Sequence, residues 1–206
     1  MIITFIASIQ TLGADISERL SNIHAKCLFE NGYHQIVVQA QYGSSINQEA
    51  IKNYEVATAA GIKRVDYYIT PSTANDPVEQ IRKTMDVLQS HNVIQTNSIV
   101  WLNAEDIDSY FGTQRENQVF ILRLLEEISQ HLGSERVGVY TSNQSWMALV
   151  DPNWRDTIIY KLKYAHFDGV TDFDDFVSFG GWKKPSMKTF TGDVNECGMR
   201  INKEYQ

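Results

Sequence analysis

Short runs of β-branched and aromatic residues alternate with amphipathic segments along most of the chain, and this rhythm limits the fold more than any other feature. The runs have the length of buried strands, and the segments between them have helical spacing. Strands are expected at residues 12–16, 35–40, 64–70, 98–105 and 136–142, with further candidates at 158–167 and 186–191. Alternating strands and helices predict a parallel sheet with right-handed crossovers.

Helices are expected at residues 17–31, 47–60, 77–90 and 115–131, with a short one near 144–150. Ser17 is the expected N-cap of the first, and the segment 115–131 has the clearest apolar face, formed by Val119, Leu122, Leu125 and Ile128. This many units in 206 residues predict a single-domain, irregular, TIM-like β/α barrel with fewer helices than strands. An open doubly wound sheet is the alternative.

Composition narrows the classes of partner. The net charge of −7 argues against nucleic acid and anionic membrane surfaces, and the sequence has no apolar run long enough to span a membrane. Without a glycine-rich phosphate motif after the first strand, no nucleotide, other cofactor or metal is expected. The chain is expected to be a monomer, with a barrel domain at residues 13–206. Residues 1–12 are interpreted as a remnant of a signal peptide or as an extension.

The stretch "IVWLNAED" places polar side chains at the end of an apolar strand. Trp101, Asn103 and Glu105 share one face because side chains alternate along a strand. In a barrel such strand ends meet at one mouth, where functional groups collect. The polar and aromatic residues expected at this mouth also include Asp15, Tyr42, Tyr68, Tyr140, His166 and Asp168. Carboxylates and flat rings at one mouth are typical of a carbohydrate site.

Structural roles are the alternatives for the same residues. Glu105 could cap a helix or form a salt bridge, and Asp15 could be an N-cap. The tyrosines could be packing at the edge of the core, and His166 could be a hydrogen-bonded structural residue. The acidic run at residues 172–176 is expected to be a solvated loop rather than a calcium site.

Six stretches in order resemble the lysozymes of glycoside hydrolase family 25, especially their nematode and protist members. These stretches are "GADIS", "NGYHQIVVQAQYG", "VWLNAED", "VGVYTSNQSW", "YAHFDG" and "FGGWKKPSMKTFTGDVNECG". The resemblance extends from about Gly13 to Gly198. It implies a β/α barrel that cleaves the β-1,4 bond between N-acetylmuramic acid and N-acetylglucosamine in peptidoglycan, with assistance from the substrate's own acetamido group.

The resemblance also assigns roles to residues. Glu105 matches the general acid/base and Asp15 the aspartate of the first strand, whereas Asn103 stands where the family has a second aspartate. A last family carboxylate falls near Asn202, and Lys163 replaces a tryptophan. The residues expected to bind the substrate are Tyr42, Tyr68, Tyr140, His166 and Asn202.

An amide at position 103 cannot stabilise positive charge as a carboxylate does, which predicts a weakened muramidase acting on peptidoglycan in digestion or defence. A non-catalytic glycan-binding or regulatory relative is the alternative, and a barrel enzyme acting on another polysaccharide is a third reading. Cys27 and Cys197 would be neighbours if the barrel closes, which predicts a disulfide and a secreted or lumenal protein. Asn143 begins a glycosylation sequon, which matters only in that compartment.

Overall fold

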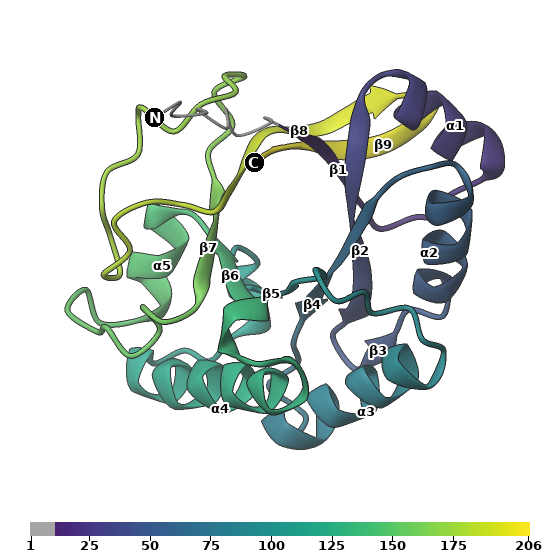
Figure 1. Cartoon of the computed structure of the whole chain (residues 1–206). Coiled ribbons are helices and arrows are strands. Elements are labelled where there is room, and N and C mark those ends of the chain that lie inside the picture. Colours follow the sequence, from purple (N-terminus) through teal and green to yellow (C-terminus); the bar gives the residue numbers. More distant parts are fainter. Residues whose placement is uncertain (1–10) are drawn as a thin grey trace, which may run out of the picture.

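The computed structural model describes residues 11–206. The prediction that residues 1–12 are a signal-peptide remnant or an extension therefore falls mostly outside the described residues. Within them, strands and helices alternate as the sequence pattern predicted (Figure 1). The strands are β1 (Leu12–Ile16), β2 (Tyr33–Tyr42), β3 (Ser45–Ile46), β4 (Arg64–Thr70), β5 (Val100–Asn103), β6 (Val137–Thr141), β7 (Lys161–Ala165), β8 (Met187–Glu196) and β9 (Met199–Tyr205). The α-helices are α1 (Asn22–Glu30), α2 (Glu49–Ala59), α3 (Pro77–Ser90), α4 (Gln114–Leu132) and α5 (Asn143–Leu149).

Eight of the strands close into a barrel, and β3 extends the sheet as a small hairpin on β2. The order is β1-β9-β8-β7-β6-β5-β4-β2-β3, with β1 also paired to β2, so the sheet closes on itself. The open-sheet alternative is therefore wrong. Figure 1 looks along the barrel, with helices outside the ring from α1 round to α5 and with loops and the β8–β9 hairpin in the remaining sector.

The all-parallel expectation fails at β9, which the sequence pattern did not identify as a strand. This strand pairs antiparallel with both β1 and β8, because a tight turn at Cys197 and Gly198 reverses the chain after β8. Both turn residues have positive φ (55° and 81°), which glycine adopts at no steric cost. The last barrel position is therefore filled by a hairpin instead of a strand–helix unit.

Two helix details also differ from expectation. The first helix begins at Asn22 rather than near Ser17, because Ser21 is its N-cap and accepts a hydrogen bond from the His24 amide. In α4 the buried face is rotated relative to the expected one, and Val119 is exposed. Phe120 and Leu124 are buried in its place.

The core has two layers. The larger one lies between the strands and the helices, and a smaller cluster fills the inside of the barrel. Trp101 is the largest member of the inner cluster and is fully buried. Its ring passes so close to Gly138 that a Cβ there would lie 2.3 Å from ring atoms, so position 138 requires glycine.

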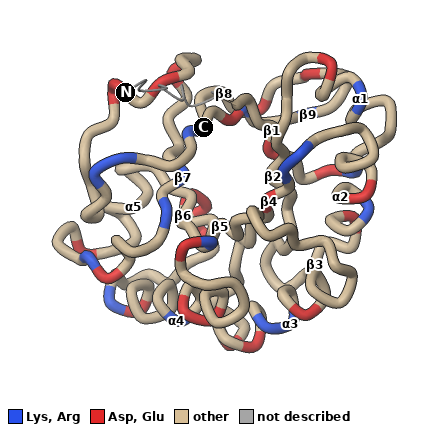
Figure 2. Tube along the Cα trace, in the orientation of Figure 1, with Lys and Arg blue, Asp and Glu red and all other residues tan. Residues whose placement is uncertain are grey.

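Cys27 on α1 and Cys197 in the β8–β9 turn form a disulfide, as predicted, with a Cα–Cα distance of 5.8 Å. Cys197 lies between β8 and β9. Disulfides of this kind are typical of proteins in oxidising compartments. Among residues 11–206, no helix combines the length and apolar character needed to cross a bilayer. Figure 2 shows acidic and basic positions interspersed around the outside of the ring.

Candidate functional site

The candidate site lies at the end of the barrel where the parallel strands finish. Asp15 is the penultimate residue of β1. Glu105 comes two residues after the end of β5, and His166 comes directly after β7. Asn202 enters from the antiparallel strand β9 and pairs in register with Asp15. The topology therefore brings residues from both ends of the chain to one end of the barrel.

A buried lysine occupies the interior beneath this mouth. The Lys163 ammonium lies 2.6 Å from an oxygen of Asp15 and 3.0 Å from an oxygen of Glu204, and its side chain is fully buried. Burial alone would lower the pKa of Lys163, but the two carboxylates raise it above its ordinary value. The charge of Asp15 is therefore matched by an internal cation.

Glu204 completes this ion cluster from β9. The Thr189 hydroxyl lies within hydrogen-bonding distance of both carboxylate oxygens, at 3.1 and 2.9 Å, and the residue is 1% exposed. Burial raises the pKa of Glu204 to about 7, although the neighbouring Lys163 opposes this effect. The three charged groups therefore form one coupled unit inside the barrel.

Asn103, Tyr140 and Lys163 form a row across three neighbouring strands. Asn103 pairs in register with Tyr140, and Tyr140 pairs with Lys163. The Lys163 ammonium also lies 4.4 Å from the centre of the Tyr140 ring, a cation–π distance. This row connects the position of the expected second aspartate to the Asp15 ion pair.

Two hydrogen bonds fix the Asn103 side chain. Its Nδ2 donates to the Thr70 hydroxyl at 2.9 Å, and its Oδ1 accepts the Glu105 amide at 3.0 Å. A carboxylate could keep both contacts, since the Thr70 hydroxyl can donate as well as accept. These contacts would therefore accept an aspartate as well as the neutral amide that is present.

Glu105 faces the N-terminus of α5. One of its oxygens accepts a hydrogen bond from the Ser142 amide at 2.6 Å, and Ser142 is the N-cap of that helix. The expected alternative of a helix-capping role therefore has direct structural support. The other alternative, that Asp15 caps a helix, is wrong because Ser21 caps α1. Glu105 remains half-buried at the mouth.

His166 belongs to a charged cluster on the rim. Its Nε2 lies 2.9 Å from Asp175, and its ring stacks on Tyr164 with a centroid distance of 5.3 Å. The Lys188 ammonium contacts Asp168 at 2.7 Å and Asp175 at 3.1 Å. Part of the acidic run is thus paired rather than solvated. The Lys188 ammonium therefore places a positive charge between these two carboxylates.

The expected site residues divide between two hollows at the mouth. Asp15, Tyr68 and Asn202 line one of about 280 Å³, and Glu105 and His166 line another of about 430 Å³. Burial, together with the charge of Asp15, raises the pKa of Tyr68, so this phenol stays protonated.

Two further tyrosines of the expected site lie outside both hollows. Tyr42, at the end of β2, is 59% exposed, as a platform for a sugar ring would be. Tyr140 is 8% exposed, and burial raises its pKa above the ordinary value. It packs in the barrel interior, where its ring contacts the Lys163 ammonium.

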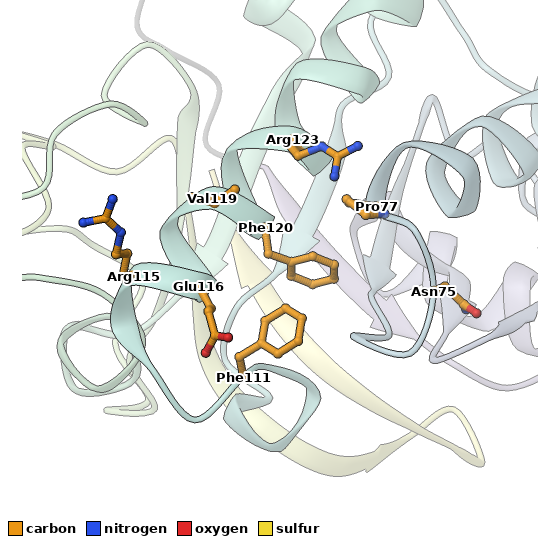
Figure 3. Close-up of a pocket in the computed structure, with 8 residues that line it drawn as sticks. All are labelled: Asn75, Pro77, Phe111, Arg115, Glu116, Val119, Phe120 and Arg123. Carbon is orange, nitrogen blue, oxygen red and sulfur yellow. The ribbon is translucent and has the colours of Figure 1, made fainter.

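Another hollow, of about 360 Å³, lies between the N-terminal ends of α3 and α4 (Figure 3). Figure 3 shows the rings of Phe111 and Phe120 turned toward each other, and their centroids are 5.3 Å apart. Its lining is apolar and includes none of the expected site residues. It is therefore separate from the mouth.

Sequence reasoning missed Glu204 as a member of the site. The signal was present in the segment "MRINKEY", where Asn202 and Glu204 are two residues apart and therefore share a strand face. Lys163 was noted only as a replacement for tryptophan, and nothing in its sequence context indicates that two carboxylates surround it.

Comparison with known proteins agrees with this architecture. A family model described as lysozyme-like protein 1 matches residues 7–190. The chain is 31% identical over 197 residues to the probable GH family 25 lysozyme 5 of Dictyostelium discoideum, covering 94% of this chain and 89% of that protein. It is 26% identical to lysozyme-like protein 5 of Caenorhabditis elegans, over 94% and 90% of the two chains. It is also 28% identical to counting factor 50 of D. discoideum, over 93% of this chain and 64% of that protein.

Solved structures share the same barrel at low identity. The bacterial lysozyme from Streptomyces coelicolor superposes with a TM-score of 0.75 at 14% identity, over 96% of this chain and 92% of that one. The autolysin LytC from Streptococcus pneumoniae, in complex with a synthetic peptidoglycan ligand, gives a TM-score of 0.74 at 14% identity. The match covers 97% of this chain and 47% of that one.

The closed, irregular β/α barrel thus has the same fold as these solved structures. The sequence matches make the assignment specific. The chain belongs to the family of GH25 lysozymes and lysozyme-like proteins.

Proposed function

We propose that this protein binds the glycan strands of bacterial peptidoglycan at the mouth of its barrel and cleaves them slowly, with Glu105 as the general acid/base. The position of Glu105 two residues after the end of β5, half-buried beside an open hollow, supports this role. The exposed ring of Tyr42 and the polar edge near Asn202 supply surfaces suited to sugar faces and hydroxyl groups. The relative LytC, solved with a peptidoglycan ligand, supports the substrate class.

The contact between Lys163 and Asp15 is the observation that best supports a slow rate of cleavage. Cleavage of a glycosidic bond develops positive charge on the sugar, which a nearby carboxylate stabilises. Here Asp15 is neutralised at 2.6 Å by a buried cation, and position 103 carries an amide. Loss of one hydrogen-bond donor aimed at a transition-state charge costs a factor of about 10²–10³ in rate, and we expect a loss of similar size here by analogy.

A non-catalytic, glycan-binding or regulatory role is the second candidate. The hydrogen bond from the Ser142 amide to Glu105 favours it, because this carboxylate then serves as part of a helix cap. The name of the relative counting factor 50 indicates that chains of this family are not all described as lysozymes. The disulfide supports a secreted or lumenal location for either role.

The two candidates are separated by measuring the release of reducing ends from purified peptidoglycan, together with binding to the same material by sedimentation. The proteins to compare are the native chain, Glu105→Gln, Asn103→Asp and the exposed control Glu135→Gln. Slow native cleavage that is lost in Glu105→Gln and rises about tenfold or more in Asn103→Asp would support a weakened enzyme. Binding by all four proteins without cleavage would support the second candidate. Cleavage of chitin but not of peptidoglycan would overturn the assigned substrate.

A further inference from the structure

Asn143 lies on the rim of the hollow that contains Glu105. It is the first residue of α5 and follows Ser142, whose amide donates to the Glu105 carboxylate. Asn143, Gln144 and Met147 form one wall of that hollow, and Glu105 and His166 lie on others. A group attached to Asn143 would therefore stand at the entrance to this part of the mouth.

The Asn143 side chain is available for modification. The residue is exposed, and its side-chain amide makes no hydrogen bond to the described part of the chain. The residues Asn143, Gln144 and Ser145 form an N-glycosylation sequon. This motif is used in the secretory pathway, where the Cys27–Cys197 disulfide would also form.

We propose that Asn143 carries an N-linked oligosaccharide and that this oligosaccharide restricts access to the hollow beside Glu105. The second half of the proposal rests on the proposed function of the mouth. In the modification, the Asn143 Nδ2 attacks C1 of the first sugar of a dolichyl diphosphate-linked oligosaccharide. The new N–C1 bond replaces the C1–O bond to diphosphate, dolichyl diphosphate leaves, and the amide nitrogen gives up one proton to a base of the transferase.

Size and position explain the restriction. The hollow has a volume of about 430 Å³ and opens beside the first turn of α5. A branched oligosaccharide is larger than this space, so it would cover the entrance instead of entering it. A peptidoglycan strand approaching Glu105 from the α5 side would then meet the attached glycan first.

The modification is tested on the protein isolated from its own cells. Peptide mass spectrometry should find hexosamine-containing mass on the peptide with Asn143, and removal by peptide N-glycosidase in ¹⁸O-water should leave labelled aspartate at position 143. An unmodified Asn143 peptide in the native protein would overturn the proposal, whatever the protein does to peptidoglycan.

The restriction is tested without any peptidoglycan, so that its failure is distinct from failure of the proposed function. The rate of diethyl pyrocarbonate modification of His166, which lines the hollow, is compared with that of the exposed His91 on the C-cap of α3. Removal of the oligosaccharide should speed modification of His166 several-fold and leave His91 unchanged. Equal rates at His166 in both forms would overturn the restriction.

Matched variants secreted from a eukaryotic host complete the test. Ser145→Thr keeps both the sequon and a hydroxyl near Ser142, whereas Ser145→Ala removes the sequon without changing Asn143. Ser145→Thr should behave as the modified protein, and both Ser145→Ala and Asn143→Gln should behave as the deglycosylated one. Fast His166 modification in Ser145→Thr despite an intact oligosaccharide would count against the restriction.

Discussion

The ammonium of Lys163 lies 2.6 Å from the carboxylate of Asp15 inside a closed barrel, and the two residues are 148 positions apart in the sequence. A buried ion pair is held in place by the cost of leaving either charge alone. The Asp15 carboxylate thus serves as the counter-ion of a structural lysine. This relationship links the stability of the barrel to the weakness that we propose for its chemistry.

Removal of Lys163 should destabilise the protein strongly. Lys163→Met would leave Asp15 and Glu204 buried without their cation, which typically costs about 3–5 kcal/mol in the free energy of unfolding. Urea unfolding at pH 8 would measure the effect. The control is Lys161→Met on the same strand, where the lysine is half-buried and forms no ion pair among the described residues. This substitution should change the free energy of unfolding by less than about 0.5 kcal/mol. Equal losses in the two variants would contradict this account of the cluster.

Glu204 should make the protein less stable as the pH rises from 5 to 8. Its pKa is raised in the folded chain to about 7 from an ordinary value of 4.5, so the folded state holds a proton that the unfolded state has released. The corresponding stability is present below pH 4.5 and is lost as the pH passes 7. Over the interval from pH 5 to 8 the loss is on the order of 2–3 kcal/mol.

This pH effect is measured as the difference between wild type and Glu204→Gln. Urea titrations at pH 5, 6, 7 and 8 give the free energy of unfolding of each protein. As the pH rises, this free energy should fall in the wild type relative to the variant. The exposed control Glu135→Gln should follow the wild type at every pH. A constant difference between wild type and Glu204→Gln across this range would show that Glu204 does not titrate there.

The barrel was predictable from the sequence because its signals are local. Most apolar runs and several helix boundaries, such as Pro77 at the start of α3, are set by neighbouring residues, although the start of α1 was not located correctly in this way. The last strand was not predictable in this way. In β9 the alternation of Ile201 and Tyr205 with polar residues is short, and its pairing with β1 joins opposite ends of the chain.

The mouth was predictable only in outline. Positions at or just after strand ends could be assigned to one end of the barrel from the sequence, and Glu105 and His166 line one hollow there. The charge state of the site depends on contacts between distant residues, and the contact of Lys163 with Asp15 spans 148 positions. No local pattern encodes such a contact, so the neutralisation of Asp15 emerged only from the three-dimensional arrangement.

Loss of the Cys27–Cys197 disulfide should lower stability because it joins α1 to the β8–β9 turn across 170 positions. A bond that closes so long a loop contributes about 3–5 kcal/mol by restricting the unfolded chain. The double variant Cys27→Ser with Cys197→Ser should therefore unfold at lower urea concentration than the oxidised wild type. Dithiothreitol should lower the wild-type midpoint toward that of the variant and leave the variant unchanged. The oxidised wild type and the double variant could instead unfold at the same urea concentration. That result would show that the disulfide stabilises neither the hairpin nor the closure of the barrel.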